Sequence, residues 1–443
     1  MNEKEILYQF DHARLGKFHL ALILLAGSCW ALVAYGITII GFLLPSLRLE
    51  WHISSSLLGV IAGAGLLGMF IGSIIGGTLA DRIGRRGTLV WALFFSGLFF
   101  LISSSAWNFA SLLIMRVLTG IGLGAIIPII STMVTEFSPY KVRGTLSVLI
   151  NGCWGLGGTL AAFVGYKVVL DYGWRLAMLF GCVAFLLSLL VRITVPESMR
   201  FLIGKGRLVE AQQQFRKIKL EFDDIPSKLT ILPTEIVNQK RSSGGIWSES
   251  FAHITFSIWF MWIALNFLYQ GVLVWLPTLL ASTQITESRS FLLTLLISLG
   301  QIPGTLIVAF LVDRMKRRKL LIISLVLLTL STFLLGFAQN DIWILAVGFL
   351  LMIFNGMAWG MAYSVSSELY PTRMRGLATG WAAGVGRLGG VPAPIVVGLI
   401  MQQGGSLTLV FSLIAMAPFL AIIVISTLKM DTTGKSLEAI SPD

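Results

Sequence analysis

Apolar stretches long enough to cross a lipid bilayer recur along the whole chain, and this feature constrains the fold more than any other. Residues 20–44, "LALILLAGSCWALVAYGITIIGFLL", contain no charged side chain, and a membrane-spanning helix needs only about 20 apolar residues. The 443-residue chain is 56% hydrophobic and 12% charged. This composition excludes an ordinary soluble domain.

Twelve such stretches predict an all-α membrane protein with twelve transmembrane helices. A helix rises about 1.5 Å per residue, so each stretch can span a hydrocarbon core roughly 30 Å thick. The predicted spans are residues 19–45, 57–80, 88–106, 110–135, 146–170, 174–194, 252–280, 290–312, 319–338, 341–366, 377–401 and 406–428.

The distribution of Lys and Arg predicts the orientation of these spans. Of the 33 basic residues, three fall inside spans beyond their end residues, namely Arg116, Lys167 and Arg387, and three lie at or beside span ends on one side, namely Arg48, Arg175 and Arg289. All others lie in the tails and in the loops after the even-numbered spans, and loops rich in Lys and Arg stay in the cytoplasm. We therefore expect a cell-membrane protein (plasma or inner membrane) with both termini cytoplasmic. The net charge of +12 follows from this topology and requires no nucleic-acid partner.

The chain also contains an internal repeat. "ADRIGRR" (80–86) returns as "VDRMKRR" (312–318), and "EFSPYKVRG" (136–144) returns as "ELYPTRMRG" (368–376), each 232 residues later. At the same spacing, "GCWGLGG" (152–158) corresponds to "GVGRLGG" (384–390). We predict an N-terminal six-helix bundle with its tail, residues 1–194, and a C-terminal bundle with its tail, residues 252–443. The linker, residues 195–251, is expected to be cytoplasmic and to carry short helices, because apolar residues recur at helical spacing in 206–220.

Duplicated bundles are a transporter architecture, with a polar site between the halves near the bilayer midplane. At this point the chain resembles a known family. "GTLADRIGRRG" (77–87) is similar to the signature loop of the major facilitator superfamily, and "RVLTGIGLG" (116–124) and "PESMRFL" (196–202) are similar to sugar-porter motifs. "SELYPTRMRG" and "GRLGG" resemble the metabolite:proton symporter branch, which includes nicotinate permeases and synaptic-vesicle-glycoprotein-like transporters. The sequence departs from the usual motif at Met199, where Pro normally follows "PES".

The loop motifs predict a pair of gating clusters. Carboxylates at helix ends can meet the positive N-terminus of a neighbouring helix. The resemblance implies that this neighbour is span eleven for Asp81 and span five for Asp313. Simple topology charges and helix caps are the alternative interpretation. The candidate gating residues are Asp81, Arg82, Arg85, Glu136, Arg143, Asp313, Arg314, Glu368 and Arg375.

Polar and aromatic residues on helical stripes predict a substrate cavity. The resemblance implies that spans one, four, seven and ten face it, and amides are poorly tolerated where they face lipid. Each of these residues taken alone could instead form a helix–helix hydrogen bond. The candidates for substrate contacts are Arg387, Arg116, Asn355, Trp359, Tyr363, Asn266, Tyr269, Gln270, Gln301, Tyr35, Trp30 and Trp381.

The membrane interior lacks an acidic side chain. Related proton symporters carry an aspartate in span one, two residues before a glycine. If Gly36 is that glycine, Ala34 occupies the position of the aspartate, and Ala31 that of a second, upstream one. All 21 acidic residues fall near helix ends, in loops or in tails. Arg116 and Arg387 therefore have no obvious partner, and a charge at the centre of a span costs roughly 2.5–3.5 kcal/mol on insertion scales.

These observations predict a carrier of small organic anions. A carboxylate fits the guanidinium fork of Arg387 in a bidentate pair, and aromatic side chains suit a planar aromatic or heterocyclic monocarboxylate such as nicotinate. Arg116 lies about six residues from its span end and could instead extend to the surface. The alternatives are a sugar-porter-like carrier of a neutral solute and a non-transporting membrane sensor. No enzyme activity, cofactor or metal site is expected, and the default oligomeric state by resemblance is a monomer. The resemblance implies proton coupling, whereas the missing acid favours coupling through the substrate, uniport or anion exchange.

Overall fold

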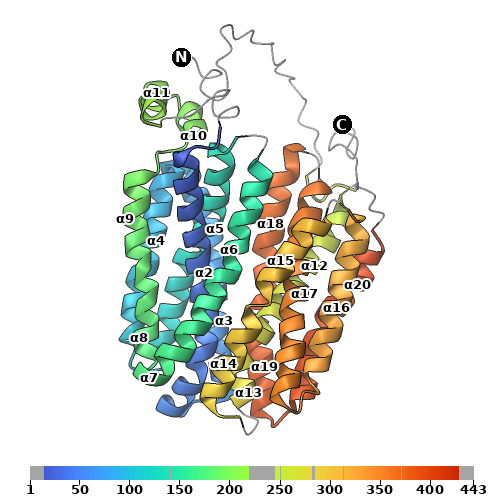
Figure 1. The fold of residues 1–443 in the computed structure, drawn as a ribbon. Coiled ribbons are helices and arrows are strands. Elements are labelled where there is room, and N and C mark those ends of the chain that lie inside the picture. Colours follow the sequence, from blue (N-terminus) through green and yellow to red (C-terminus); the bar gives the residue numbers. More distant parts are fainter. Residues whose placement is uncertain are drawn as a thin grey trace.

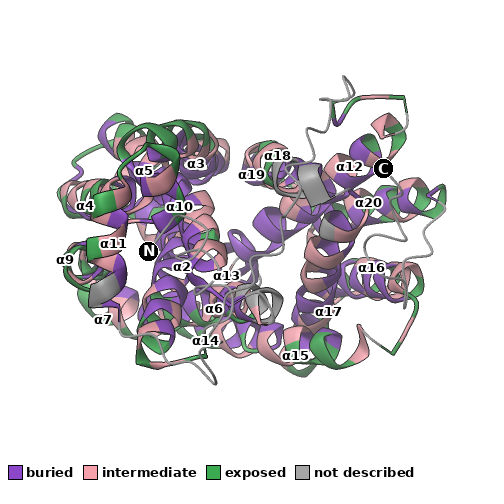
Figure 2. Ribbon diagram, turned by 90° about the horizontal axis from the view of Figure 1, so that it is seen from above, coloured by how far each residue is buried: buried purple, intermediate pink, exposed green. Residues whose placement is uncertain are grey.

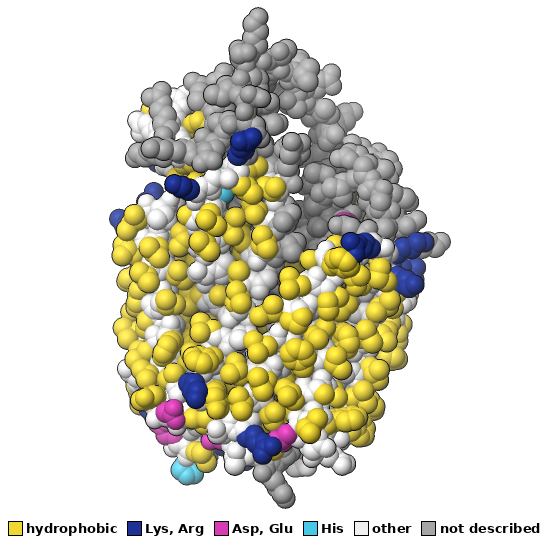
Figure 3. Space-filling view, viewed as in Figure 1, with side chains coloured by type: hydrophobic (Ala, Val, Ile, Leu, Met, Phe, Trp, Pro, Cys, Tyr) yellow, Lys and Arg dark blue, Asp and Glu magenta, His cyan; other side chains and the backbone are white. Residues whose placement is uncertain are grey.

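A computed structural model describes residues 14–139, 142–218, 245–249, 251–281, 285–312, 314–370 and 372–428. It contains twelve helical spans that are long and apolar enough to cross a membrane, within these ranges. The prediction of twelve spans is thereby confirmed. The outer surface of the bundle is a broad hydrophobic band, with Lys and Arg gathered towards its two ends (Figure 3). The chain is accordingly a multi-pass membrane protein.

The first half of the chain forms one bundle (Figure 1). Its helices are α2 (Lys17–Trp51), α3 (Ser55–Ile83), α4 (Arg85–Ser104), α5 (Phe109–Phe137) and α6 (Arg143–Val164), followed by the π-helical turn η1 (Gly165–Val169), α7 (Leu170–Tyr172), α8 (Trp174–Leu179), the short 3-10 turn η2 (Phe180–Cys182) and α9 (Val183–Thr194). Two short helices follow this bundle, α10 (Met199–Gly204) and α11 (Leu208–Lys217). Helix α11 lies within the stretch 206–220 for which the sequence predicts a helix.

The second half forms the other bundle. Its helices are α12 (Ala252–Leu273), α13 (Leu276–Ala281), α14 (Glu287–Ser298), α15 (Gln301–Leu311), α16 (Arg317–Leu335), α17 (Asp341–Glu368), α18 (Thr372–Gly390), α19 (Pro392–Gln402) and α20 (Leu407–Ser426). Viewed along the bundle axis, the two halves lie beside each other (Figure 2). The start of α2 and the end of α20 lie at the same end, here called the terminal side, and the opposite end is called the far side (Figure 1).

The repeat is visible in how the helices begin. The side chain of Asn108 accepts a hydrogen bond from the backbone of Ser111 at the start of α5, and Asn340 does the same for Trp343 at the start of α17. Asn108 and Asn340 lie 232 residues apart. An asparagine that satisfies a free N–H group at a helix start is a favoured cap. The two halves therefore use the same residue type at equivalent positions to begin equivalent helices.

The repeat extends to the closest helix crossings. A Cβ atom on Gly72 would lie 2.0 Å from the Ile121 carbonyl oxygen, and one on Gly304 would lie 2.1 Å from that of Ile353. Because no side chain fits at such a distance, α3 packs directly on the backbone of α5, and α15 on that of α17. Small residues that let helix backbones approach are typical of membrane bundles.

Close contacts join the halves on the far side. A Cβ atom on Gly59 of α3 would lie 2.4 Å from the Pro394 carbonyl oxygen of α19, and one on Gly398 would lie 2.4 Å from that of Ser55. The rings of Phe42 and Phe291 meet edge to face, with centroids 5.1 Å apart. Backbone contact between α3 and α19 leaves no room there for a solute to pass.

Candidate functional site

A cavity lies between the two halves and contains about 1280 Å³ of empty space, including the part open to solvent. Helices α2, α3, α5 and α6 line it from the first half, and α12, α15, α17 and α18 from the second. Its lining extends to Ser364 and Val312, near the terminal-side ends of α17 and α15. The predicted residues that line it are Trp30, Asn266, Tyr269, Gln270, Gln301, Trp359, Tyr363 and Arg387.

The glycines of "GVGRLGG" position Arg387. A Cβ atom on Gly386 would lie 2.8 Å from the Asn266 amide nitrogen, and one on Gly389 would lie 2.3 Å from the Ile263 carbonyl oxygen. Helix α18 therefore lies directly on α12, with Gly386 and Gly389 at the contact. Arg387, between these glycines, is a half-buried lining residue of the cavity. No hydrogen bond or ion pair joins its guanidinium to another residue in the described part of the chain.

Three aromatic side chains form one wall of the cavity. Trp262 of α12 meets Trp359 and Tyr363 of α17 edge to face, with ring centroids 5.3 Å and 4.8 Å away. The Trp262 indole N–H donates to the Ser366 hydroxyl at 2.9 Å, which fixes the ring. Edge-to-face aromatic pairs at these spacings are favourable. This aromatic wall stands beside Arg387, because Gly386 packs against Trp262.

A hydrogen bond crosses the cavity from one half to the other. The indole N–H of Trp154 on α6 donates to the Tyr269 hydroxyl on α12 at 2.7 Å. Trp154 also packs edge to face on Trp30, with centroids 5.9 Å apart. Trp154 and Trp262 also line the cavity, although neither is among the contact residues predicted from the sequence. The repeat offered a signal for Trp262, because it is the counterpart of Trp30.

Three predicted contact residues lie outside the cavity lining. The Tyr35 hydroxyl donates to the Ala177 carbonyl oxygen at 2.5 Å, within the first bundle. Trp381 is 49% exposed and stacks on Trp259 on the outer surface, with centroids 6.1 Å apart. Asn355 is fully buried, and its two amide atoms have no hydrogen-bond partner among the described residues. Each therefore packs within or on the surface of one half.

Arg116 also lies outside this cavity. Its side chain is 3% exposed, and its guanidinium donates to the Gly36 carbonyl oxygen at 3.0 Å. The alternative that Arg116 extends from its position near a span end to the surface is therefore wrong. A Cβ atom on Gly65 would lie 2.7 Å from one guanidinium nitrogen, so Arg116 packs against the glycine backbone of α3. A separate small void beside it is also lined by Gln270 of the other half.

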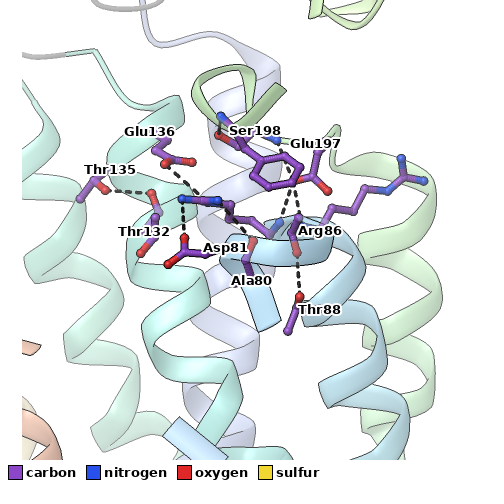
Figure 4. Close-up of polar contacts among 12 residues, drawn as sticks. Ala80, Asp81, Arg86, Thr88, Thr132, Thr135, Glu136, Glu197 and Ser198 are labelled. Atoms are coloured by element: carbon purple, nitrogen blue, oxygen red, sulfur yellow. Dashed lines mark hydrogen bonds and ion pairs between the residues drawn. The ribbon is translucent and has the colours of Figure 1, made fainter. Parts of the chain in front are cut away.

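The first predicted gating cluster brings Asp81 and Glu136 close together at the terminal side (Figure 4), and Arg85 contacts both. Arg85 lies 3.1 Å from Asp81 and 3.7 Å from Glu136. The Asp81 carboxylate is 73% exposed and pairs with this arginine, four residues further along the chain. Arg82 is exposed to solvent. The cluster therefore joins α3, α4 and α5 within one half.

Glu197 also belongs to this cluster, although it is not among the gating residues predicted from the sequence. Its carboxylate accepts the backbone N–H groups of Arg85 at 2.8 Å and Arg86 at 3.2 Å, at the start of α4 (Figure 4). A negative charge is favourable at a helix N-terminus. Gly84, with φ of 107°, brings the chain so close that a Cβ atom would lie 2.3 Å from the carboxylate. The "PES" motif thus ties the linker to the first bundle.

The second cluster repeats the central ion pair of the first. Arg317 lies 3.0 Å from Glu368. These two residues are the counterparts of Arg85 and Glu136, 232 residues later in the chain. Arg317 was missed, although this spacing would have found it. The predicted Arg314 instead lies over the Phe310 ring at 3.6 Å. Asp313 and the side chains of Arg143 and Arg375 lie outside the described residues.

Comparison with known proteins places this geometry in a family. Residues 14–443 match the family described as sugar (and other) transporter. The niacin transporter NiaP of Acinetobacter baylyi is 33% identical over 98% of this chain and 99% of its own length. The 4-hydroxybenzoate transporter PcaK of Pseudomonas putida is 30% identical over 79% of each chain. These relatives are transporters and not enzymes.

The fold itself has a solved counterpart. The xylose transporter XylE from E. coli, in a partially occluded inward-open conformation, superposes with a TM-score of 0.75 at 21% identity, covering 95% of this chain and all of that one. This likeness shows the fold alone. With the family match spanning the described helices, the chain belongs to the sugar (and other) transporter family and has the major facilitator fold.

Proposed function

We propose that this chain transports small aromatic or heterocyclic monocarboxylates by alternating access, and that Arg387 binds their carboxylate. The observation that carries the proposal is the position of Arg387. It is a permanently charged guanidinium, lines the cavity between the halves and forms no hydrogen bond or ion pair with another described residue. A guanidinium presents two parallel N–H donors that match the two oxygens of a carboxylate.

The aromatic wall supports a planar ligand. Trp262, Trp359 and Tyr363 offer ring faces and edges beside Arg387, and Asn266 and Gln301 offer amides that can orient ring substituents. Ligand sites are mostly apolar surfaces with a few placed polar groups. The names of the relatives agree, since niacin and 4-hydroxybenzoate are aromatic acids.

Nicotinate and nicotinamide form a matched pair for the test. They share the pyridine ring and differ in whether the substituent is a carboxylate or a neutral amide. We expect the purified chain to bind and transport nicotinate at least about tenfold better, because charge-assisted hydrogen bonds are roughly twice as strong as neutral ones. Equal handling of both would contradict the role of Arg387. Transport of D-xylose in preference to nicotinate would instead identify a neutral-solute carrier, and binding without transport a sensor.

The terminal side is the cytoplasmic side in this proposal, and the protein resides in the cell membrane. The support is the concentration of Lys and Arg at the terminal side. With the far side closed by the contact between Gly59 and Pro394, the described conformation is then inward-facing. A cysteine introduced at Gln403, in the exposed far-side loop, should react with a membrane-impermeant maleimide added outside whole cells. Reaction only after permeabilisation would reverse the orientation.

A single chain forms the whole proposed site. Both walls of the cavity come from the two halves of one polypeptide, so we infer that the monomer is the transporting unit, with the substrate and the bilayer as its partners. No nucleic-acid partner enters the proposal. Transport rates per chain in proteoliposomes should not change when the number of chains per vesicle is reduced to one. A rate that disappears at this dilution would require an oligomer.

A further inference from the structure

The two states of the proposed carrier place very different demands on Arg387. Its guanidinium stays charged at any physiological pH. It lies at the surface where the halves face each other, which must open and close during alternating access. When the cavity is open, water can hydrate the charge. When the cavity closes, that water is expelled, and the charge needs another partner.

The protein supplies no carboxylate for this purpose. The described acids of the spans lie near the helix ends: Asp81, Glu136 and Glu368 at the terminal side, and Glu50, Asp171, Glu287 and Asp341 at the far side. Throughout the full sequence, no Asp or Glu occupies the middle of a span. A substrate carboxylate is then the anion available to pair with Arg387 in the closed cavity. The loaded carrier closes over a neutral pair, whereas the empty carrier closes over an unpaired charge.

Arg116 shows that this protein tolerates one buried arginine, but its situation is different. Arg116 of α5 packs against Gly65 of α3 and donates a hydrogen bond to Gly36 of α2, all within one half, although Gln270 of the other half lines the small void beside it. Rocking of one half against the other leaves that bond in place. Arg387 has no such bond among the described residues, so its surroundings change in every cycle. An unpaired charge leaving water is strongly unfavourable.

We propose that the chain is an obligatory exchanger of organic monoanions, because the empty carrier cannot readily close over Arg387. This inference rests on the proposed function and adds its mode of transport. One monocarboxylate enters as another leaves, so no net charge crosses the membrane and no proton is required. The return of the carrier is fast when an anion is bound and slow when none is.

The test uses the full chain in proteoliposomes and radiolabelled nicotinate at pH 7.5. One set of vesicles contains unlabelled nicotinate, and the other contains only buffer and chloride. A protonophore abolishes any pH gradient, and valinomycin with potassium fixes the membrane potential. Initial uptake should be at least about tenfold faster into the nicotinate-loaded vesicles and should not change with the membrane potential. Equal rates in both sets would overturn obligatory exchange and leave the proposed function intact. Uptake in neither set, with no nicotinate binding, would overturn both.

A substitution that supplies an internal partner tests the cause. Ala383 lines the cavity four residues before Arg387 on α18, and a Glu four residues before a cation is the favoured orientation of a helical ion pair. Ala383→Glu should let the empty carrier return. Initial uptake into nicotinate-loaded vesicles should then be less than about twofold faster than uptake into buffer-filled vesicles. Ala383→Gln, of the same size without the charge, should keep the acceleration near its original ratio. The same ratio in both variants would show that the charge of Arg387 does not limit the empty carrier.

Discussion

Each half of the bundle contains one arginine in its interior, and the two are held in opposite ways. Arg116 of the first half is almost fully enclosed, donates to a backbone carbonyl and packs on Gly65. Arg387 of the second half lies between two glycines of α18 and lines the cavity without a hydrogen bond or ion pair to another described residue. The hydrogen bond to Gly36 and the contact with Gly65 hold the first arginine within its own half. Exposure between the halves leaves the second available to a ligand.

The repeat sharpens this comparison, because each arginine corresponds to a glycine in the other half. At the spacing of 232, Arg116 corresponds to Gly348 and Arg387 to Gly155. The space around Arg116 is filled differently in the second half. There Ile297, the counterpart of Gly65, reaches Gly348, and a Cβ atom on this glycine would lie 2.6 Å from the end of the isoleucine. A small and a large residue have exchanged places across one helix contact.

The largest effect is expected from neutralising Arg387. Arg387→Gln should weaken nicotinate binding by at least about 30-fold, since loss of one member of a buried charge pair costs at least about 2 kcal/mol. The nicotinate affinity of Arg387→Lys should lie between that of the unsubstituted chain and that of Arg387→Gln, because an ammonium keeps the charge but cannot form the bidentate pair. Isothermal titration calorimetry on the purified protein measures both. Unchanged nicotinate affinity in Arg387→Gln would remove this residue from the site.

The exchanged pair can be tested by moving it between halves. Gly65→Ile alone should lower the stability of the protein by about 1–3 kcal/mol, because it overfills the space that Arg116 occupies. Gly65→Ile with Arg116→Gly should be less harmful than the sum of the single changes, by about 1 kcal/mol, as expected for residues in contact. Thermal unfolding in detergent measures the cycle. Gly77→Ile on the same helix is the control, since nothing lies within 4 Å of a Cβ there. Strictly additive effects would argue against the packing relationship.

Smaller changes in stability, of opposite sign at the two positions, are expected when alanine replaces Gly155 and Gly348, the counterparts of the two arginines. Gly155→Ala should raise stability by about 0.5–1 kcal/mol, because alanine favours the helix and the nearest atom to its Cβ would be 3.7 Å away, on Ile302. Gly348→Ala should lower stability, because its Cβ would collide with Ile297. The unfolding midpoints of both variants report the difference. Two shifts of the same sign would show that the counterparts of the arginines are not packed as described.

The fold was predictable from the sequence because its signals are repeated. Twelve hydrophobic stretches indicate the spans, and the spacing of 232 relates Asp81 to Asp313 and Trp30 to Trp262. The same spacing relates the caps Asn108 and Asn340. The orientation of single side chains was less predictable. Successive residues of a helix are turned by about 100°, so Tyr35, five positions after Trp30, points roughly 140° away from it and meets Ala177 instead of the cavity.

Other positions depend on how helices meet, which no spacing reveals. Trp381 lies six residues before Arg387, a turn of roughly 120° from it, and faces outward against Trp259. Asn355 shares a stripe with Trp359, yet it is fully buried outside the cavity lining. Arg116 carries a charge that the sequence places in a cavity, but its guanidinium contacts Gly36 and Gly65 of its own half instead. The sequence lists which residues are polar, whereas the contacts between helices decide which of them reach the cavity.

The smallest effect on binding is expected from Arg116, and it tests the comparison most directly. Arg116→Met replaces the guanidinium with an apolar side chain of similar length. The charge is enclosed without a described acidic partner, and replacing buried charges by packed apolar groups is often neutral or stabilising. We expect nicotinate affinity to change by less than about threefold, or about 0.6 kcal/mol, and the unfolding midpoint not to fall. Arg387→Met, the same replacement in the other half, should lose at least about 30-fold in affinity. A loss in Arg116→Met as large as this would mean that both arginines act on the substrate, and that enclosure inside one half does not separate scaffold from site.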